Sequence, residues 1–339
     1  MLPECGGSIR ELVIHYVAGD TVATPVYQQF LPTLRDEVTV YVVCQDRNAF
    51  RELSRRIGRI GCQLIPVFTH HPITTWSRDR WVASMPDASG RITLLTPATE
   101  LGAESWPARA GDAKVAFDLA DTLAGRVQAR RLGIGFDGGD LLADDCNVFV
   151  TPALIHRNRH RSAESGEQLT ALLQRELGGQ RIVPLDNNAP PHHAGMFMAA
   201  ARDRTMLVGD PSLAAPLLDQ AARNALLPDA DFSAATQAQF DAVANQLASI
   251  GYRVVRIPTV AASDARTYLT YVNVITDRRP DGTRIVYMPV YRGADALNAA
   301  AADVWRSLGY QVCFIDCTSC YRHYGTLHCL VNVLSRQPD

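Results

Sequence analysis

The sequence predicts a mixed α/β protein that is built from repeated units rather than from two separate domains. The chain opens with alternating strand and helix patterns, which are typical of α/β proteins. A strand, strand, helix, strand pattern then recurs with a period of about 60–70 residues, longer than most solenoid repeats. No stretch rich in proline, glycine and serine divides the chain, so we expect residues 1–339 to form one domain.

Each expected element follows from its local residue pattern. Runs of β-branched and aromatic residues predict strands, and longer amphipathic or alanine-rich stretches predict helices. The expected strands are 12–17, 38–43, 63–68, 91–96, 147–151, 181–185, 205–211, 254–257, 268–275, 285–289 and 311–315. The expected helices are 48–60, 113–130, 166–177, 212–226, 234–250 and 294–308. Loops are expected at 97–111 and at the basic cluster 156–161.

The composition excludes several classes of protein. Of the 339 residues, 47% are hydrophobic and 20% are charged, as in ordinary globular proteins. The formal net charge of -2 gives no basic footprint for nucleic acid, and no apolar run approaches the roughly 18 residues of a membrane span. Residues 1–7 lack the pattern of a signal peptide. The eight cysteines are therefore expected to be reduced thiols in the cytoplasm. The sequence leaves a homo-oligomer open.

The candidate nucleophile lies in residues 324–333 (Tyr-Gly-Thr-Leu-His-Cys-Leu-Val-Asn-Val). This pattern predicts a loop that leads into a strand, with Cys329 at the junction. A buried core thiol is the structural alternative, because free cysteines are among the most buried residues. A cysteine nucleophile needs a histidine that manages protons and a group that orients this histidine. Such partners would have to come from elsewhere in the chain.

Three other motifs offer these partners: Asp79, Asp137 and His193. Taken singly, each has a structural explanation, since a lone aspartate, a Gly-Gly pair or a His-His pair usually belongs to a turn or a surface loop. Together, and in this order, the motifs resemble those of the guanidino-group-modifying enzymes. These are the agmatine and arginine deiminases, the dimethylarginine dimethylaminohydrolases and the amidinotransferases. The motifs are 76–79 (Trp-Ser-Arg-Asp), 136–140 (Phe-Asp-Gly-Gly-Asp), 193–197 (His-Ala-Gly-Met-Phe), 270–273 (Thr-Tyr-Val-Asn) and 325–329 (Gly-Thr-Leu-His-Cys).

The resemblance implies a pentein fold, an α/β propeller of five quasi-repeated ββαβ modules around a central site, which agrees with the repeat length. It also implies a hydrolase of a guanidino C–N bond. Cys329 attacks the guanidino carbon and forms a thiouronium, and a ureido product then leaves. His193 protonates the departing ammonia or amine and afterwards activates water. Asp79 grips the guanidinium, and Asp137 holds the substrate or orients His193. Carboxylates suit a guanidinium because they bind it by paired, charge-assisted hydrogen bonds.

The resemblance implies no metal and no other cofactor. The expected partner is a small guanidino compound. Besides the four catalytic candidates, we expect substrate contacts from a further set of residues, namely Trp76, Arg78, Asp140, Arg157, Asn273, Gly325 and His328.

Two positions bear on the substrate. Arg157 falls where dimethylarginine dimethylaminohydrolases carry an arginine that binds the α-carboxylate, which implies an amino-acid substrate rather than agmatine. The structural alternative is that the basic cluster 156–161 is only a solvated surface. Gly195 stands where deiminases and amidinotransferases usually have an acidic residue. The glycine implies room for an N-substituted or bulkier guanidine, or else a changed site.

Three alternatives compete with a guanidino hydrolase. The first is a structural zinc site. Residues 313–328 hold three cysteines and two histidines, which are zinc ligands, and Cys317 and Cys320 have CxxC spacing, but a second CxxC at finger spacing is missing. An amidinotransferase would share the first half-reaction and pass the amidino group to an amine. A non-catalytic pentein would use the same fold for binding. The joint presence of Cys329, His193, Asp79 and Asp137 favours an enzyme.

Overall fold

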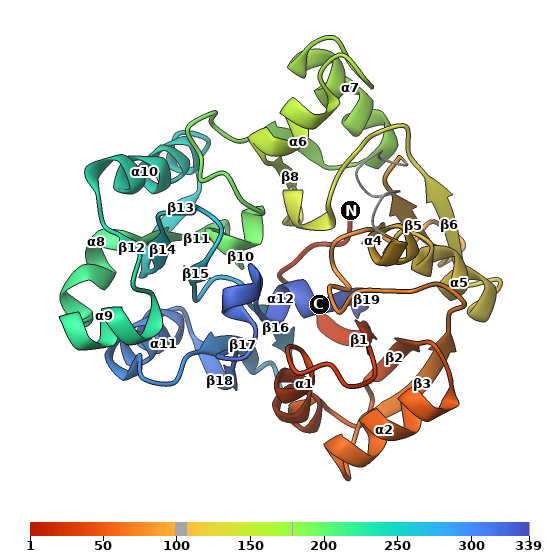
Figure 1. The fold of residues 1–339 in the computed structure, drawn as a ribbon. Coiled ribbons are helices and arrows are strands. Elements are labelled where there is room, and N and C mark those ends of the chain that lie inside the picture. Colours follow the sequence, from red (N-terminus) through yellow and green to blue (C-terminus); the bar gives the residue numbers. More distant parts are fainter. Residues whose placement is uncertain (99–106, 178, 339) are drawn as a thin grey trace.

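The computed structural model describes residues 1–98, 107–177 and 179–338. In these ranges the chain forms modules that follow one another around a central axis (Figure 1). The strands lie toward the middle of the ring, and helices lie toward its outside (Figure 1). Examples of these helices are α2 (Arg47–Ile57), α7 (Gly166–Leu177), α10 (Ala234–Ser249) and α11 (Asp295–Ser307). In each module a first strand runs antiparallel to a second, and a helical crossover leads to a third strand parallel to the second. The predicted mixed α/β fold of ββαβ units is therefore confirmed.

The two ends of the chain share one module. β19 (Val331–Gln337) pairs antiparallel with β1 (Ser8–His15), with Leu12 opposite Val333. β1 runs parallel to β2 (Thr39–Cys44), which runs parallel to β3 (Gln63–Phe68). The crossovers are α1 (Thr24–Phe30) and α2 (Arg47–Ile57). The last strand thus supplies the first strand of the module that opens the chain, and this pairing closes the ring.

The other modules follow in chain order. The second has β4 (Val82–Ala83), β5 (Ile92–Thr96), α4 (Pro107–Asp112), α5 (Val115–Thr122) and β6 (Val127–Arg131). The third has β7 (Leu141–Ala143), β8 (Asn147–Val150), α6 (Pro152–Asn158), α7 (Gly166–Leu177) and β9 (Arg181–Pro184). The fourth has β10 (Met198–Ala201), β11 (Thr205–Asp210), α8 (Pro211–Ala214), α9 (Gln220–Leu226), α10 (Ala234–Ser249) and β13 (Arg253–Pro258). The fifth has β16 (Ile275–Arg278), β17 (Arg284–Val290), α11 (Asp295–Ser307) and β18 (Tyr310–Asp316).

Short elements complete the described chain. A small antiparallel sheet is formed by β12 (Ala230–Asp231), β14 (Val260–Ala262) and β15 (Tyr268–Leu269). The short helix α12 (Leu327–Leu330) precedes β19 near the middle of the ring (Figure 1). Apolar strands such as β8 and β11 are buried along their whole length, because sheet and helices cover both of their faces. The turns that precede the first strands of the modules lie near the axis of the ring (Figure 1).

Two predicted elements differ from the structure around the second and third modules. The helix expected at 113–130 ends early, because Gly125 has a φ of +87° and the chain then enters β6, which pairs with β5. The loop expected at 156–161 overlaps α6. This helix starts because Thr151 caps it through Leu154 N and Pro152 occupies its first turn.

Other expected boundaries also change. The loop expected at 97–111 lies in part outside the described residues, and its last residues belong to α4. The strand expected at 268–275 is two short strands, β15 and β16, separated by a turn. The helix expected at 212–226 is broken into α8, a 3-10 turn and α9. Cys329 lies inside α12, one short turn before β19, rather than in a loop.

Candidate active site

The candidate residues lie at equivalent points of the modules, just before each first strand. Asp79 precedes β4 and Asp137 precedes β7. His193 precedes β10, Asn273 precedes β16 and Cys329 precedes β19. Because the turns before these strands face the axis of the ring, residues far apart in the sequence meet there.

A cavity of about 410 Å³ opens at this point. Most of the residues predicted from the sequence line it, namely Trp76, Asp79, Asp137, Asp140, Arg157, His193 and Cys329. Several other lining residues were not predicted from the sequence, namely Arg109, His192, Arg266, His323 and Tyr324. The cavity therefore brings a thiol and imidazole groups together with carboxylates and guanidinium groups.

Cys329 is held in α12 by contacts with Asn273. The Asn273 amide oxygen accepts hydrogen bonds from Thr326 Oγ1 (2.6 Å) and His328 N (3.0 Å). Its amide nitrogen donates to Gly195 O at 2.9 Å and lies 3.6 Å from Cys329 Sγ. The thiol is 4% exposed, so it is buried as the structural alternative expects, yet it also lines the cavity.

Gly325 gives Trp76 its place beside the nucleophile. A Cβ on Gly325 would lie 2.6 Å from the Trp76 ring and 3.1 Å from Cys329 Cβ. No side chain fits there, so the glycine lets the indole close over the turn that carries Cys329. Gly325 itself is not a lining residue of the cavity. Its contacts in the structure are with Trp76 and Cys329, and a contact with substrate stays a prediction.

His193 is positioned by the Gly-Gly pair of the third module. A Cβ on Gly139 would lie 2.4 Å from His193 Nδ1, so the ring packs directly on the glycine backbone. His193 Nε2 lies 3.7 Å from Asp137 Oδ2. Burial alone would lower the pKa of His193, but contacts with Asp137 and Cys329 and the charge of Asp79 raise it well above its usual value. The imidazole therefore favours its protonated form.

Asp79, which is buried, and Asp137, whose side chain is 15% exposed, form a pair of carboxylates that a single arginine bridges. Arg109 Nη1 lies 2.5 Å from Asp79 Oδ2, and Arg109 Nη2 lies 2.7 Å from Asp137 Oδ1. Burial and the charge of Asp137 raise the pKa of Asp79 against the opposing effect of Arg109. Burial would also raise the pKa of Asp137, but His193, Arg109 and Arg157 hold it far below its usual range. Arg80 Nη1 adds a further contact to Asp137 Oδ1 at 2.9 Å.

Asp140 and Arg157 form a second ion pair at the cavity. Arg157 Nη1 lies 2.8 Å from Asp140 Oδ2, and its Nη2 lies 3.4 Å from Asp137 Oδ2. The other Asp140 oxygen accepts a hydrogen bond from Thr151 Oγ1. Asp140 thus orients Arg157 and the turn around Asp137. Arg157 belongs to the last turn of α6 and lines the cavity, so it is not only part of a solvated cluster.

Arg78 and His328, which were expected to contact substrate, are not among the residues that line the cavity. Both side chains bind Glu4 instead. The Arg78 guanidinium forms an ion pair with this carboxylate, and His328 Nε2 lies 2.9 Å from its Oε2. The charge of Arg78 and the His328 contact outweigh burial and lower the pKa of Glu4 to about 2. Asn273 is likewise absent from the lining and acts through the Cys329 turn.

Gly195 does not enlarge the substrate cavity. A Cβ at this position would lie 3.2 Å from His328 Nδ1 and 3.3 Å from Asn273 Nδ2. The space that we expected for a substituted guanidine is therefore filled by these two side chains. The acidic side chain that deiminases usually carry here would meet the same groups.

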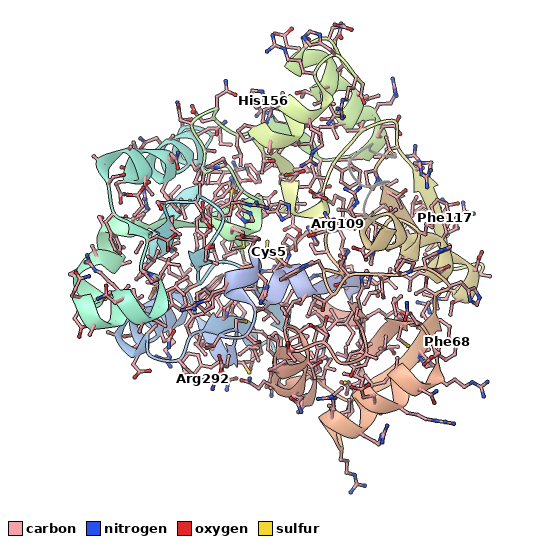
Figure 2. All side chains as sticks on the ribbon, in the orientation of Figure 1. Cys5, Phe68, Arg109, Phe117, His156 and Arg292 are labelled. Carbon is pink, nitrogen blue, oxygen red and sulfur yellow. The ribbon has the colours of Figure 1, made fainter. Side chains whose placement is uncertain are left out.

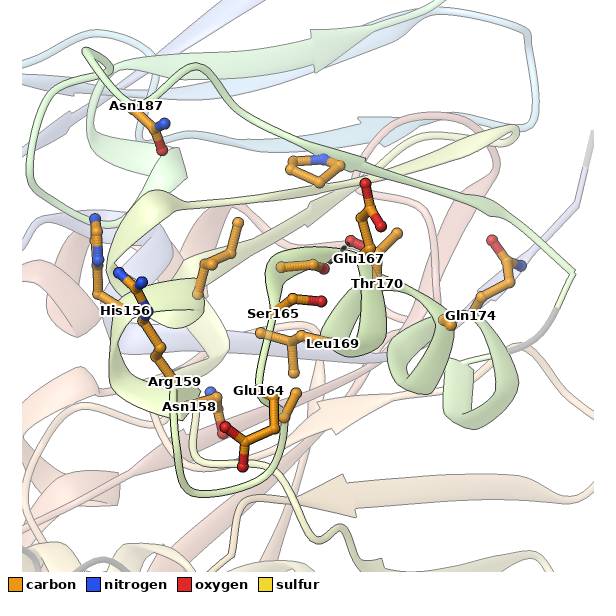
Figure 3. A pocket seen from close by; sticks show the side chains of 15 residues that line it. His156, Asn158, Arg159, Glu164, Ser165, Glu167, Leu169, Thr170, Gln174 and Asn187 are labelled. Atoms are coloured by element: carbon orange, nitrogen blue, oxygen red, sulfur yellow. Dashed lines mark hydrogen bonds between the residues drawn. The ribbon is translucent and has the colours of Figure 1, made fainter.

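A larger cavity of about 950 Å³ lies apart from these residues, between α6 and α7 (Figure 3). His156, Arg159 and Glu164 are among its lining residues, and none of the catalytic candidates is. The five cysteine and histidine residues considered for zinc do not gather: within the described ranges no group of three or more His, Cys, Asp or Glu could hold a metal ion. Cys317 and Cys320 are buried free thiols.

Three charged residues at or behind the cavity were not predicted from the sequence, namely Arg80, Arg109 and Glu4. Arg80 directly follows Asp79, so its position offered a signal. Arg109 stands in a stretch without a recognisable motif. Glu4 lies near the start of the chain, far from every motif. Its backbone is held by hydrogen bonds with Ala143 O and Thr276 Oγ1, and its carboxylate contacts His328 Nε2.

Comparisons with known proteins identify the family and the fold. Residues 18–333 match the model of the Porphyromonas-type peptidyl-arginine deiminase family. Agmatine deiminase from C. jejuni has a TM-score of 0.68 at 14% identity, over 100% of this chain and 96% of that one. A cysteine-to-serine variant of that enzyme with substrate bound has a TM-score of 0.70 at 14% identity, over 100% and 96% of the two chains.

Agmatine deiminase from Enterococcus faecalis has a TM-score of 0.64 at 14% identity, over 99% of this chain and 95% of that one. At these identities the likeness shows the pentein fold alone. No curated protein sequence matches the chain. No helix in the described ranges is long and apolar enough to cross a membrane.

The family match decides between the alternatives left open by the sequence. It covers most of the chain and includes every candidate catalytic residue. It favours a hydrolase over an amidinotransferase and over a non-catalytic binding protein. The chain belongs to the Porphyromonas-type peptidyl-arginine deiminase family and is a hydrolase of guanidino C–N bonds.

Proposed function

We propose that the chain hydrolyses an arginine-like guanidino substrate with Cys329 as the nucleophile. The supporting observation is that Cys329, His193, Asp79 and Asp137 line one cavity although they come from different modules. Carboxylates that already hold one guanidinium are suited to hold the guanidinium of a substrate. Such binding aims the guanidino carbon at the thiol, and positioning of this kind can lower a barrier by roughly 7–11 kcal/mol.

The proposed reaction has two steps. Cys329 reacts as its thiolate: its sulfur forms a bond to the guanidino carbon, and the bond from that carbon to the departing nitrogen breaks. Protonated His193 gives its proton to this nitrogen, which leaves as ammonia or an amine. The product of this step is a thiouronium on Cys329. Neutral His193 then takes a proton from water, the oxygen attacks the same carbon, and the thiolate leaves from a ureido product.

The raised pKa of His193 suits the first step, because a general acid must hold its proton at the working pH. Asp137 stabilises the imidazolium from 3.7 Å. Asn273 and Gly325 act as positioning residues, since they shape the turn that carries Cys329 without lining the cavity.

Replacement of the nucleophile tests this proposal. Cys329→Ala and Cys329→Ser are expected to lose turnover while thermal unfolding stays close to that of the wild type. Cys146→Ala is the matched control, because Cys146 is an exposed free cysteine. Ureido product is measured with arginine, agmatine, methylated arginines and guanidino acids. Wild-type activity in Cys329→Ala would reject the assignment.

For the substrate, we propose a compound with a carboxylate near its guanidino group. The support is that Arg157 lines the cavity and Arg266 lines it as well, with its guanidinium over the Tyr324 ring at 4.4 Å. Arg157→Ala is expected to weaken turnover of arginine more than that of agmatine, which lacks a carboxylate. An equal loss for both compounds would remove this role from Arg157.

We also propose that residues 1–339 form one catalytic domain in the cytoplasm. The pairing of β1 with β19 supports a single unit, because neither end of the chain can complete this sheet alone. The free state of all eight cysteines supports a reducing compartment. Limited proteolysis that released a stable fragment lacking β19 would contradict the single domain.

A further inference from the structure

Arg109 makes the contacts that a substrate guanidinium needs. It belongs to α4 and lies close to the centre of the ring (Figure 2). Its two terminal nitrogens bind different carboxylates, Asp79 at 2.5 Å and Asp137 at 2.7 Å. The side chain is 15% exposed and lines the same cavity as Cys329. One planar cation thus spans two carboxylates that come from two modules.

The backbone below Arg109 is fixed, while its long side chain is not enclosed. A Cβ on Gly111 would lie 1.8 Å from Pro72 O, so the end of α4 packs tightly on that loop. Asp112 accepts hydrogen bonds from Thr74 N (2.7 Å) and Thr74 Oγ1 (2.6 Å). Movement of Arg109 is therefore a rotation of its side chain, without displacement of α4.

A second acceptor for Arg109 lies within reach. Asp112 Oδ2 is 4.0 Å from Arg109 Nη1, and the Asp112 side chain is fully buried. Asp137 keeps contacts with Arg80 and Arg157 when Arg109 moves. Asp79 forms its ion pair with Arg109, so a substrate guanidinium can take the place that Arg109 leaves.

We propose that Arg109 is an affinity-setting residue that competes with the substrate for Asp79 and Asp137. In the empty site it neutralises the two carboxylates. When substrate arrives, its guanidinium takes over these carboxylates and the Arg109 side chain turns toward Asp112. This inference rests on the proposed function, because it assumes that Asp79 and Asp137 bind the substrate guanidinium.

If Arg109 competes with the substrate, the apparent affinity for substrate is the intrinsic affinity multiplied by the fraction of molecules in which Arg109 does not occupy the two carboxylates. If Arg109 occupies the carboxylates in about nine of ten molecules, its removal lowers the dissociation constant about tenfold. A single lysine ammonium cannot bridge both carboxylates as the guanidinium fork does. Lysine at this position is therefore a weaker competitor, although its charge is the same.

Calorimetric titration with arginine and with agmatine tests the proposal in the Cys329→Ala background, where turnover is absent. Arg109→Gln is expected to bind the preferred compound about tenfold more tightly, and Arg109→Lys is expected to lie between it and the parent. Arg130→Gln is the matched control, because Arg130 is an exposed arginine that pairs with Glu176. In the active enzyme, Arg109→Gln is expected to lower KM more than it changes kcat.

Three outcomes would overturn the proposal. Equal or weaker binding by Arg109→Gln would show that Arg109 supports the site permanently. Tighter binding by Arg109→Gln with unchanged binding by Arg109→Lys would show a simple charge effect. In both cases the proposed function would stand. If neither compound binds to any variant, parent included, the proposed function fails together with this inference.

Discussion

Gly139→Ala is the substitution that most directly tests how His193 is positioned. The new Cβ would lie 2.4 Å from His193 Nδ1, 2.5 Å from Cγ and 2.9 Å from Cβ. Ordinary contacts of a Cβ begin near 3.4 Å, so the ring must retreat by about 1 Å. A displacement of this size in a catalytic group can cost about 10²-fold in rate. We expect kcat to fall by about this factor.

The KM of Gly139→Ala distinguishes displacement of His193 from a general disruption of the active site. The contacts of Asp79 do not involve Gly139, so KM is expected to change little. Steady-state measurement of ureido product gives kcat and KM, and thermal unfolding reports the cost of overpacking, which is typically about 1–3 kcal/mol. Gly133→Ala is the matched control, because nothing lies within 4 Å of its added Cβ. Wild-type kcat in Gly139→Ala would refute the reasoning.

Three further predictions follow from the contacts behind the cavity. Folding lowers the pKa of Glu4 from 4.5 to about 2. This shift contributes about 3 kcal/mol to the free energy of unfolding. The contribution is present above pH 4.5 and is lost as the pH falls toward 2. Glu4→Gln should therefore lower the free energy of unfolding at neutral pH and flatten its dependence on pH in this acid range; an unchanged acid limb in denaturant titrations would contradict this. Asn273→Ala removes the oxygen that accepts hydrogen bonds from Thr326 Oγ1 and His328 N, and each of these bonds is worth about 1 kcal/mol. The substitution should lower kcat more than it raises KM. An unchanged kcat would show that Asn273 does not position Cys329. Activity should persist after chelation and dialysis, and elemental analysis checks that metal has been removed. Loss of activity that is recovered when zinc is added would contradict a thiol mechanism.

Much of the fold could be predicted from the sequence because each module carries its own local signals. Strands such as β2 and β8 are β-branched and apolar, and they occur where the pattern places them. Boundaries were wrong where a single residue decides the path. Gly125 prevents a helix from continuing toward 130, so that β6 can form, and Thr151 with Pro152 begins a helix, α6, that runs into the basic cluster 156–161.

The site was predictable in its chemistry and less so in its geometry. Motifs identified Cys329, His193, Asp79 and Asp137, and these residues meet at one cavity. The same motifs assigned Arg78 and His328 to the substrate, although both side chains turn to Glu4. A motif fixes which residues are close in sequence. The direction of each side chain depends on charges that come from other modules, and Glu4 and Arg109 carry no local signal.

Trapping of the covalent intermediate tests the central claim most directly. The enzyme is mixed with its preferred guanidino substrate, quenched in acid during turnover and digested, and the peptides are identified by mass spectrometry. We expect the amidino adduct of the substrate on the peptide that contains Cys329, and its absence from the Cys329→Ala protein. Steady turnover with no adduct on Cys329, or an adduct on another cysteine that persists in Cys329→Ala, would contradict a thiouronium at this residue.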